Sequence, residues 1–476
     1  MPTNVGSDAV AMLPEILVFV GGLLVLVGGS FLPRERQWLS RLVTGIVLVG
    51  AVAVSVWGLS QGERMVFSSS FAVDTATGVA RVIALVATLL VVLMASDEFA
   101  GHPRESETYA LLLFATAGVT VLAGASDLML LAVGFLLASI PLYGLIGLLR
   151  LPGSAEAALK TYLMGALFGI VLLFGVTILY GVAGETTYVR LDERLSGAPQ
   201  AAVTVGVVAV LAGLMFKAGA VPAHFWVPDA AQGTSGTAAA FLTTVPKIGA
   251  LVAAYRLVSA LPDTVAWPLL IAVLAVASMT LGNLAAYTQS DPRRLLGWST
   301  VSQVGYLLVP VAVAGRSDLA LPSLLLYLAG YTTTNIAAFA VTTAVPQRRD
   351  LASYRGMSRS SPWLAAALLV ALLGLLGTPP TAVVVGKLTT ATAAWDGGQQ
   401  WLAVAVLANT LVSLFYYLRW IIPVYRPGAA GERLAPGSFA PLPWSSSVAV
   451  VAAALSVVIG LGAGLLLPLF AGAALA

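Results

Sequence analysis

Three lysines lie inside long apolar stretches, where a charged side chain is costly. Lys217 occurs in GLMFKAGAVPAHFW, Lys247 in AAAFLTTVPKIGALVAAY and Lys387 in LLGLLGTPPTAVVVGKLTTATAAW. A charge at the centre of a bilayer costs about 2.5–3.5 kcal/mol even on the more lenient insertion scale, so such residues are functional candidates. Burial weakens the hold of a lysine on its proton. The chemistry that these residues predict is proton transfer within the membrane.

Prolines interrupt the same stretches close to the lysines. Pro222 follows Lys217, Pro246 directly precedes Lys247, and Pro379–Pro380 lies two turns before Lys387. A proline removes a backbone donor and frees a carbonyl about four residues earlier. Open backbone at membrane depth is tolerated only inside protein or around a cavity, so the breaks predict hydrated pockets beside the lysines.

Other polar residues on these stretches have two interpretations. His224, just after Pro222, is a candidate for relaying a proton, and it is equally a candidate for a hydrogen-bonded packing residue. Lys217 could instead extend from a helix end to the membrane surface. The small polar residues could hold water for proton transfer or bond their own backbone; they are Ser235, Thr237, Thr243, Thr244, Thr300, Ser302, Gln303, Tyr306, Thr332, Thr333, Thr334, Asn335, Thr389, Thr390 and Thr392.

The composition identifies the elements that must hold these residues. The chain is 59% hydrophobic and only 9% charged, whereas a soluble domain carries about 25% charged residues. An all-α polytopic membrane protein is therefore predicted. The absence of cysteine excludes thiolate metal sites, and with only two histidines, His102 and His224, we expect no cofactor in this chain. The net charge of +3 is spread out, so nucleic acid is not expected as a partner.

About fourteen membrane-spanning helices are predicted, because each crossing needs about 20 apolar residues. The first run lacks a basic segment before it, since the first basic residue is Arg34, so we expect a membrane helix rather than a cleaved signal peptide. The run 361–394 is longer than one crossing needs. The predicted spans are 9–31, 40–60, 74–95, 107–124, 127–149, 157–182, 200–221, 235–261, 265–288, 294–315, 320–344, 361–394, 400–424 and 446–472.

The basic residues predict the orientation. Most of them fall in odd-numbered connections, such as Arg34, Arg104, Arg150 and Arg348, and fewer fall in even-numbered ones, where Arg256 is counted. Positive charge is enriched in cytoplasmic connections. Odd connections are therefore predicted to lie in the cytoplasm, and both termini on the outer, periplasmic side of a bacterial inner membrane.

The two interrupted spans, the seventh and the twelfth, lie five spans apart. Five is odd, so equivalent helices would cross in opposite directions, which is typical of an inverted repeat around an ion site. The predicted organisation is a three-helix segment (1–106), two inverted five-helix repeats (107–262 and 263–426) with broken helices 7 and 12, and a C-terminal loop and helix (427–476).

Several motifs resemble those of the proton-translocating antiporter-like subunits of complex I. Among these subunits, the resemblance is strongest to the subunit N type of bacterial NADH–quinone oxidoreductase. The resemblance covers roughly residues 107–426. It rests on KAGAVPAHFWVPDAAQGTSGTAAAFLTTVPKIGAL, SDPRRLLGWSTVSQVGYLL, YLAGYTTTNIAAFAV, LLGLLGTPPTAVVVGKL and NTLVSLFYYLRWIIPVY.

The resemblance implies a subunit of an NADH–quinone oxidoreductase that moves protons while quinone is reduced elsewhere in the complex. By motif position, Lys217, Lys247 and Lys387 match a chain of lysines along the membrane midplane. The family subunit carries no redox centre of its own. Its implied partners are the other membrane-arm subunits of complex I, the lipid bilayer and protons.

Two positions depart from the family pattern. AVGFLLASIPLYGL places Leu136 where the family carries a glutamate that pairs with the lysine of span 7, and Gln303 stands where many relatives have histidine. Glutamine can hold water but cannot titrate. The missing glutamate keeps one alternative open, a structural membrane-arm subunit with reduced or lost pumping. A cation/proton antiporter subunit is a second alternative, because such relatives share the fold that the resemblance implies.

Overall fold

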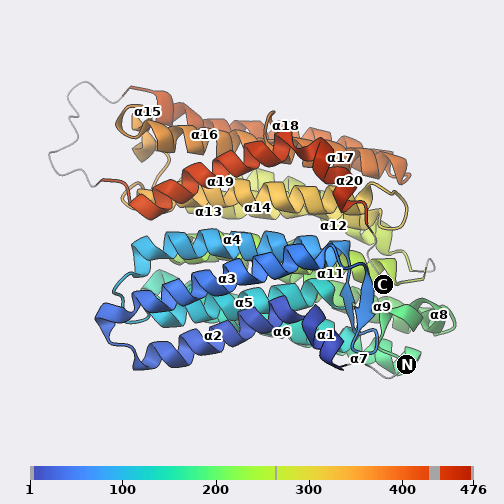
Figure 1. The fold of residues 1–476 in the computed structure, drawn as a ribbon. Helices are drawn as coiled ribbons and strands as arrows, with labels where there is room; N and C mark the ends of the chain where they lie inside the picture. Colours follow the sequence, from blue (N-terminus) through green and yellow to red (C-terminus); the bar gives the residue numbers. More distant parts are fainter. Residues whose placement is uncertain (1–4, 263–264, 428–439, 473–476) are drawn as a thin grey trace.

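The computed structural model describes residues 5–262, 265–427 and 440–472, and the fold is drawn in Figure 1. Within these ranges thirteen helices are long and apolar enough to cross a membrane. The predicted run 361–394 forms two helices of 15 residues each, α16 (Pro362–Leu376) and α17 (Ala382–Asp396), which together make a fourteenth crossing. The polytopic helical fold is therefore confirmed.

The N-terminal segment packs three crossings against the rest of the bundle. A short antiparallel hairpin, which pairs Met65 with Ala72, joins the second crossing to the third. The hairpin was not predicted, because three-residue strands leave no recognisable alternation of apolar and polar residues. The elements are α1 (Val5–Ala11), α2 (Leu13–Phe31), η1 (Arg34–Arg36), α3 (Trp38–Gly58), β1 (Arg64–Val66), β2 (Phe71–Val73) and α4 (Thr75–Phe99).

The next five crossings contain the first broken helix. Here α9 ends at Ala218, and the short helix α10 resumes at Trp226. The connection at 184–199 also holds two short helical elements. The elements are α5 (Glu105–Gly124), α6 (Leu128–Gly147), α7 (Pro152–Ala183), η2 (Tyr188–Arg190), α8 (Leu191–Ser196), α9 (Gln200–Ala218), α10 (Trp226–Gly233) and α11 (Gly236–Ser259).

The second set of five crossings contains the other broken helix, and the last crossing follows it. The connection at 345–361 also holds short helical elements, and residues 428–439 lie outside the described residues. The elements are α12 (Trp267–Ala286), α13 (Pro292–Ala312), α14 (Ala320–Ala344), η3 (Ala352–Tyr354), α15 (Met357–Ser360), α16, α17, α18 (Gln400–Tyr425), α19 (Pro443–Leu461) and α20 (Ala463–Phe470).

Side-chain caps fix where several crossings begin. Asp74, Asp127, Ser235 and Asp291 accept hydrogen bonds from backbone amides in the first turns of α4, α6, α11 and α13. An N-terminal cap satisfies amides that have no partner within the helix and typically contributes about 1 kcal/mol. These residues therefore set the helix starts in a sequence whose apolar runs alone do not define them.

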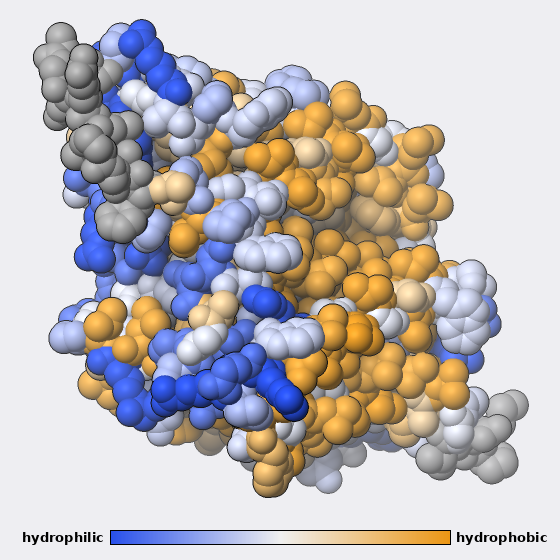
Figure 2. Space-filling model, turned by 60° about the vertical axis from the view of Figure 1, so that its left-hand side comes forward, coloured by the Kyte–Doolittle hydropathy of each residue, from blue (hydrophilic) through white to orange (hydrophobic). Residues whose placement is uncertain are grey.

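The centre of the bundle is made by α11, α13 and α14. The apolar windows of α11 and α14 are wholly buried and that of α13 nearly so, whereas α3, α7 and α18 expose most of theirs. Figure 2 shows the resulting surface, a polar end beside a broad apolar region that suits lipid. The three central helices carry most of the predicted polar candidates, so these side chains face protein and not lipid.

Two ion pairs among the described residues are buried within the bundle. Arg81 on α4 bonds Glu15 on α2, with Nη2 2.7 Å from Oε2. Arg256 on α11 bonds both carboxylate oxygens of Asp74, at 2.7 and 3.0 Å. The assignment of Arg256 to an even-numbered connection was therefore wrong, since it is a fully buried residue in the last turn of α11. Its positive charge is satisfied inside the protein, which charge counting along the sequence cannot detect.

The two ends of the chain approach the same end of the bundle. Figure 1 shows α1 and α20 there, whereas the end of α18 and the start of α19 lie at the opposite end. This arrangement agrees with an even number of crossings. Which end faces the outside stays a prediction, as do the boundaries of the two repeats; the boundary at 262–263 falls beside residues 263–264, which lie outside the described residues.

Candidate functional site

Lys217 lies in the last turn of α9, immediately before the first helix break. Gly219 ends the helix with a φ of +83°, a conformation that glycine adopts without strain. The lysine is buried, and its Nζ donates to the Ser139 hydroxyl of α6 at 2.6 Å. It therefore does not extend to the membrane surface from its helix end.

Leu136, which stands where the family carries a glutamate, lies one turn before Ser139 on α6. It offers Lys217 no carboxylate. Its side chain is 39% exposed, on the outer side of the helix, while the serine faces the lysine. The ring of Phe135 lies 5.5 Å from the Lys217 Nζ and adds a cation–π contact. Within the described residues the partners of Lys217 are thus uncharged.

Lys247 occupies the centre of α11 and bonds a carbonyl that its neighbouring proline leaves free. Pro246 has no amide hydrogen, so the carbonyl of Leu242, four residues earlier, lacks its helical donor. The Lys247 Nζ donates to this carbonyl at 2.8 Å. The ring of Trp226 on α10 lies 4.7 Å from the same Nζ. The proline therefore creates the polar contact that this buried ammonium needs.

We predict that Pro246→Ala removes this arrangement. Alanine would restore the bond from residue 246 to Leu242 and compete with Lys247 for the carbonyl. A proline inside a helix costs about 3 kcal/mol relative to alanine, so the variant should be at least as stable as the parent while proton transfer falls by about threefold.

Proton uptake by inverted membrane vesicles and thermal unfolding of the purified protein would measure both effects. Pro423→Ala is a suitable control, because Pro423 also lies inside a helix, α18, and does not contact the lysines. An unchanged rate for Pro246→Ala would show that the Leu242 carbonyl is not needed.

Lys387 lies in α17, just after the second break, and reaches back across it. Its Nζ donates to the carbonyls of Leu375 and Leu376 at 3.1 and 2.9 Å, at the C-terminal end of α16. Gly377, with a φ of +97°, ends that helix and leaves these carbonyls available. The C-terminal end of a helix carries partial negative charge, which suits an ammonium group. The ring of Tyr306 lies 4.2 Å from the same Nζ.

The two broken helices thus hold their lysines differently. Lys217 belongs to the half-helix before its break, whereas Lys387 belongs to the half-helix after its break. The prediction of a lysine near each break was right, but the two positions are not equivalent. The order of lysine and proline in the sequence already showed this difference, because Pro222 follows Lys217 whereas Pro379–Pro380 precedes Lys387.

Gln303 on α13 connects the Lys387 site with the centre of the bundle. Its Nε2 donates to the same Leu375 carbonyl at 2.8 Å, and its Oε1 accepts from the Tyr327 hydroxyl at 2.7 Å. The Tyr417 hydroxyl lies 3.5 Å from Nε2 and 2.6 Å from the hydroxyl of Ser299. The glutamine is therefore part of a polar network, although it has no titrating group.

A second network links α11 to α13 through α14. The Tyr331 hydroxyl donates to the carbonyl of Thr243 at 2.6 Å and lies 3.1 Å from the Thr300 hydroxyl. Asn335 donates to the Thr243 hydroxyl at 3.1 Å. Thr243 lies one turn before Lys247, and Thr300 one turn before Gln303. These residues place polar groups between Lys247 and Lys387. The network lies one helical turn from Lys247 on α11 and one helical turn from Gln303 on α13, and Gln303 shares the Leu375 carbonyl with Lys387.

His224 lies in the break between α9 and α10 and is buried. Neither ring nitrogen has a hydrogen-bond partner among the described residues. Its ring lies against Phe225 and Trp298, with centroids 4.2 and 5.5 Å away. The structure does not bring His224 into hydrogen-bond contact with a lysine, so its role in proton transfer stays a prediction.

The remaining polar candidates divide between the two interpretations. Thr244, Thr333 and Thr392 donate to carbonyls of their own helices, as the simpler interpretation expects. The sequence interpretation missed Ser139 as the partner of Lys217 and missed Tyr327, which is four residues from Tyr331 in YLAGY. That spacing puts both tyrosines on one helix face and could have indicated them.

Comparison with known proteins decides the family. The chain matches the family described as NADH:quinone oxidoreductase/Mrp antiporter, TM over residues 125–413. It is 64% identical over 454 residues to NADH-quinone oxidoreductase subunit N of Mycobacterium sp. (strain JLS), covering 95% of this chain and 96% of that protein. The chain belongs to the NADH-quinone oxidoreductase subunit N family.

Other members and solved structures agree with this assignment. Subunit N 1 of Streptomyces griseus is 51% identical over 469 residues, 98% of each chain. A chain of respiratory complex I from Thermus thermophilus with bound aureothin is 29% identical, with a TM-score of 0.79 over 97% of this chain and 100% of that chain. A chain of the Mrp complex from Dietzia sp. DQ12-45-1b, at 23% identity and a TM-score of 0.83, shares the fold over 98% of this chain and 96% of its own.

Proposed function

We propose that this subunit N family member is a proton-translocating membrane-arm subunit of an NADH–quinone oxidoreductase and moves protons through Lys217, Lys247 and Lys387. One observation carries the proposal. All three ammonium groups are buried, and within the described residues none of them pairs with a carboxylate. A structural lysine at such depth would be expected to have an anionic partner, because an unpaired buried charge is costly.

Their neutral partners allow each lysine to change charge without a large rearrangement. A serine hydroxyl or a backbone carbonyl accepts a hydrogen bond from either the charged or the neutral amine, and only the strength of the bond differs. A carboxylate partner would instead hold the lysine in its charged form. Uncharged contacts therefore suit a residue that must both take up and release a proton.

Packing supports the two inverted five-helix repeats. In the first set α5 packs on α6, α7 on α9 and α11 on α5; in the second, α12 packs on α13, α14 on α16 and α18 on α12. The two sets meet through α11, α13 and α14. We propose that the proton path crosses this junction, because the network around Tyr331 lies there.

We further propose that the other membrane-arm subunits are the partners of this chain in a bacterial inner membrane, with both termini on the periplasmic side. Quinone reduction would then take place in other subunits, and this chain would contribute proton transfer without a redox cofactor. The likeness to subunit N relatives supports this assignment over a separate cation/proton antiporter.

Proton uptake by inverted membrane vesicles, measured together with NADH oxidation, tests the proposed function. Lys217→Ala and Lys387→Ala should each lower the ratio of protons moved to NADH oxidised, by about threefold, since two of the three lysines remain in each variant. If neither variant changes that ratio, this chain does not pump.

The missing carboxylate favours a second candidate function, a structural membrane-arm subunit that has lost pumping. Leu136→Glu separates the two candidates. If Ser139 is a sufficient partner, an added carboxylate should leave proton uptake unchanged or reduce it, because it would favour the charged form of Lys217. Leu136→Gln controls for size and polarity. A rise in proton uptake in Leu136→Glu but not in Leu136→Gln would favour the second candidate, in which Lys217 has lost an ancestral carboxylate partner.

A further inference from the structure

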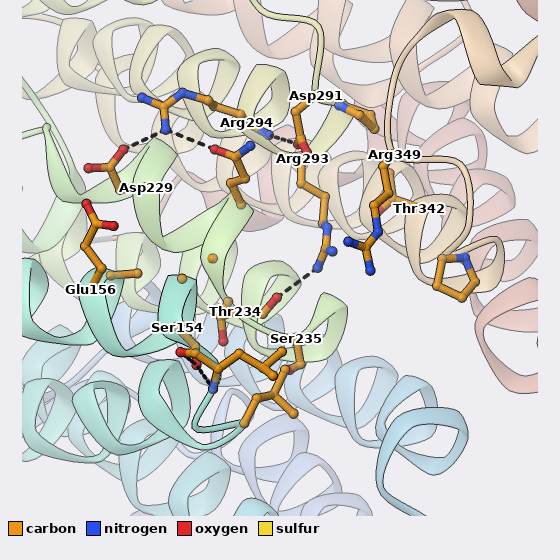
Figure 3. A pocket seen from close by; sticks show the side chains of 18 of the residues that line it. Ser154, Glu156, Asp229, Thr234, Ser235, Asp291, Arg293, Arg294, Thr342 and Arg349 are labelled. Atoms are coloured by element: carbon orange, nitrogen blue, oxygen red, sulfur yellow. Dashed lines mark hydrogen bonds and ion pairs between the residues drawn. The ribbon is translucent and has the colours of Figure 1, made fainter.

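A large cavity opens at the end of the bundle that is predicted to face the cytoplasm. Its volume is about 770 Å³, and it lies where the first set of five crossings meets the second. The start of α7, the end of α10 and the first residues of α11 form one wall, and the start of α13 with the connection after α14 forms the other. Figure 3 shows the charged side chains that line it.

The acidic groups of this cavity are already engaged. Glu98 accepts hydrogen bonds from the amides of Gly236 and Thr237 at 2.9 and 2.7 Å, at the start of α11. Asp229 pairs with Lys160 at 3.0 Å and with Arg294 at 2.7 Å. Glu156 pairs with Lys160 at 2.7 Å, and Asp291 accepts a hydrogen bond from the amide of Arg294 at 2.9 Å. Each of these four acidic side chains thus has partners of its own among the described residues.

Three other arginines line the cavity without an acidic partner. Arg293 donates to the carbonyl of Thr234 at 2.9 Å, and Arg348 donates to the carbonyl of Ser353 at 2.8 Å. Arg349 is exposed, and no contact of its guanidinium with another described residue is seen. Within the part of the chain described, none of the three forms an ion pair. In Figure 3 the side chains of Arg293 and Arg349 point the same way, toward the cavity.

Part of the cavity lining is apolar. Leu149, Leu151 and Pro346 line it together with the arginines, and Leu151 is 57% exposed. A ligand that fits must therefore offer an anionic group to the guanidiniums, and it gains further contact if an apolar group is attached. Guanidinium groups bind phosphate through paired hydrogen bonds.

We propose that this cavity binds a phosphate group between Arg293 and Arg349, from the headgroup of an acidic phospholipid or from free phosphate. Bound there, the phosphate would neutralise guanidiniums that the protein leaves unpaired. Both arginines belong to the second set of five crossings, Arg293 at the start of α13 and Arg349 in the connection after α14. Arg293 also donates to the carbonyl of Thr234, between α10 and α11 of the first set. The phosphate would therefore bind to the second set at its junction with the first.

The test uses the purified, delipidated complex that contains this subunit. Binding of dihexanoyl phosphatidylglycerol, dihexanoyl phosphatidylcholine and inorganic phosphate would be measured by native mass spectrometry and by thermal shift. We expect the acidic lipid to bind, and Arg349→Gln to weaken that binding by about tenfold through the loss of one charge-assisted contact. Arg293→Gln combined with Arg349→Gln should weaken it further.

Arg359→Gln is the matched control, because this exposed arginine belongs to the same connection but does not line the cavity. The acidic lipid should bind the complex with Arg359→Gln as tightly as it binds the parent complex. Binding of inorganic phosphate with the same sensitivity to Arg349→Gln would identify free phosphate as the source and uphold the site. Equal loss in Arg359→Gln, no effect of Arg349→Gln, or no binding of any phosphate compound would overturn it.

Discussion

Replacing Lys247 with methionine is expected to reduce proton transfer through this subunit by about a hundredfold, the scale on which a positioned acid–base group acts. Lys247 is fully buried in α11, between the Lys217 site on one side and the network around Tyr331 on the other. Its loss interrupts the path on both sides, whereas loss of an end lysine leaves the other two in contact with their networks.

Methionine suits this experiment because it keeps most of the length of the side chain, carries no charge and packs well in apolar surroundings. The Leu242 carbonyl would lose a donor, so assembly of the complex should be checked on native gels before rates are compared. NADH-driven proton uptake by inverted vesicles measures the effect. Lys160→Met is the control, since Lys160 is a surface lysine paired with Glu156 and Asp229. Equal rates in the two variants would exclude Lys247 as a proton carrier.

Replacing Arg256 with methionine is expected to lower the free energy of unfolding by about 3–5 kcal/mol, because removing one member of a buried ion pair leaves the other poorly compensated. Both side chains of the Arg256–Asp74 pair are fully buried. The pair joins α11 to the start of α4, so the N-terminal three-helix segment should detach more easily in the variant.

The midpoint of thermal unfolding and the amount of subunit in the membrane would measure this loss. Combining Arg256→Met with Asp74→Asn should recover part of the stability, because the charge that was left behind is removed while the amide oxygen can still cap α4. Arg194→Met, at an exposed site on α8, should change the free energy by no more than about 0.5 kcal/mol. A loss in Arg256→Met no larger than that would contradict the role of the pair.

The sequence by itself determined the class of protein, the number of crossings and the lysines. These depend on apolar length and on charge within apolar runs, and both are local properties of the chain. The two helix breaks could also be predicted, because proline acts on its own segment. The family resemblance identified the same three lysines from their motifs.

The partners of those lysines were decided only by the tertiary structure. Ser139 lies 78 positions from Lys217 in the chain and accepts its hydrogen bond because α6 packs beside α9. The Leu375 carbonyl accepts hydrogen bonds from both Gln303 and Lys387 because α13 packs against the second broken helix. Arg256 was counted in a connection although it lies inside the predicted span 235–261, and only the structure shows its partner, Asp74 at the start of another helix. Such contacts depend on how helices pack, which hydropathy along one segment cannot specify.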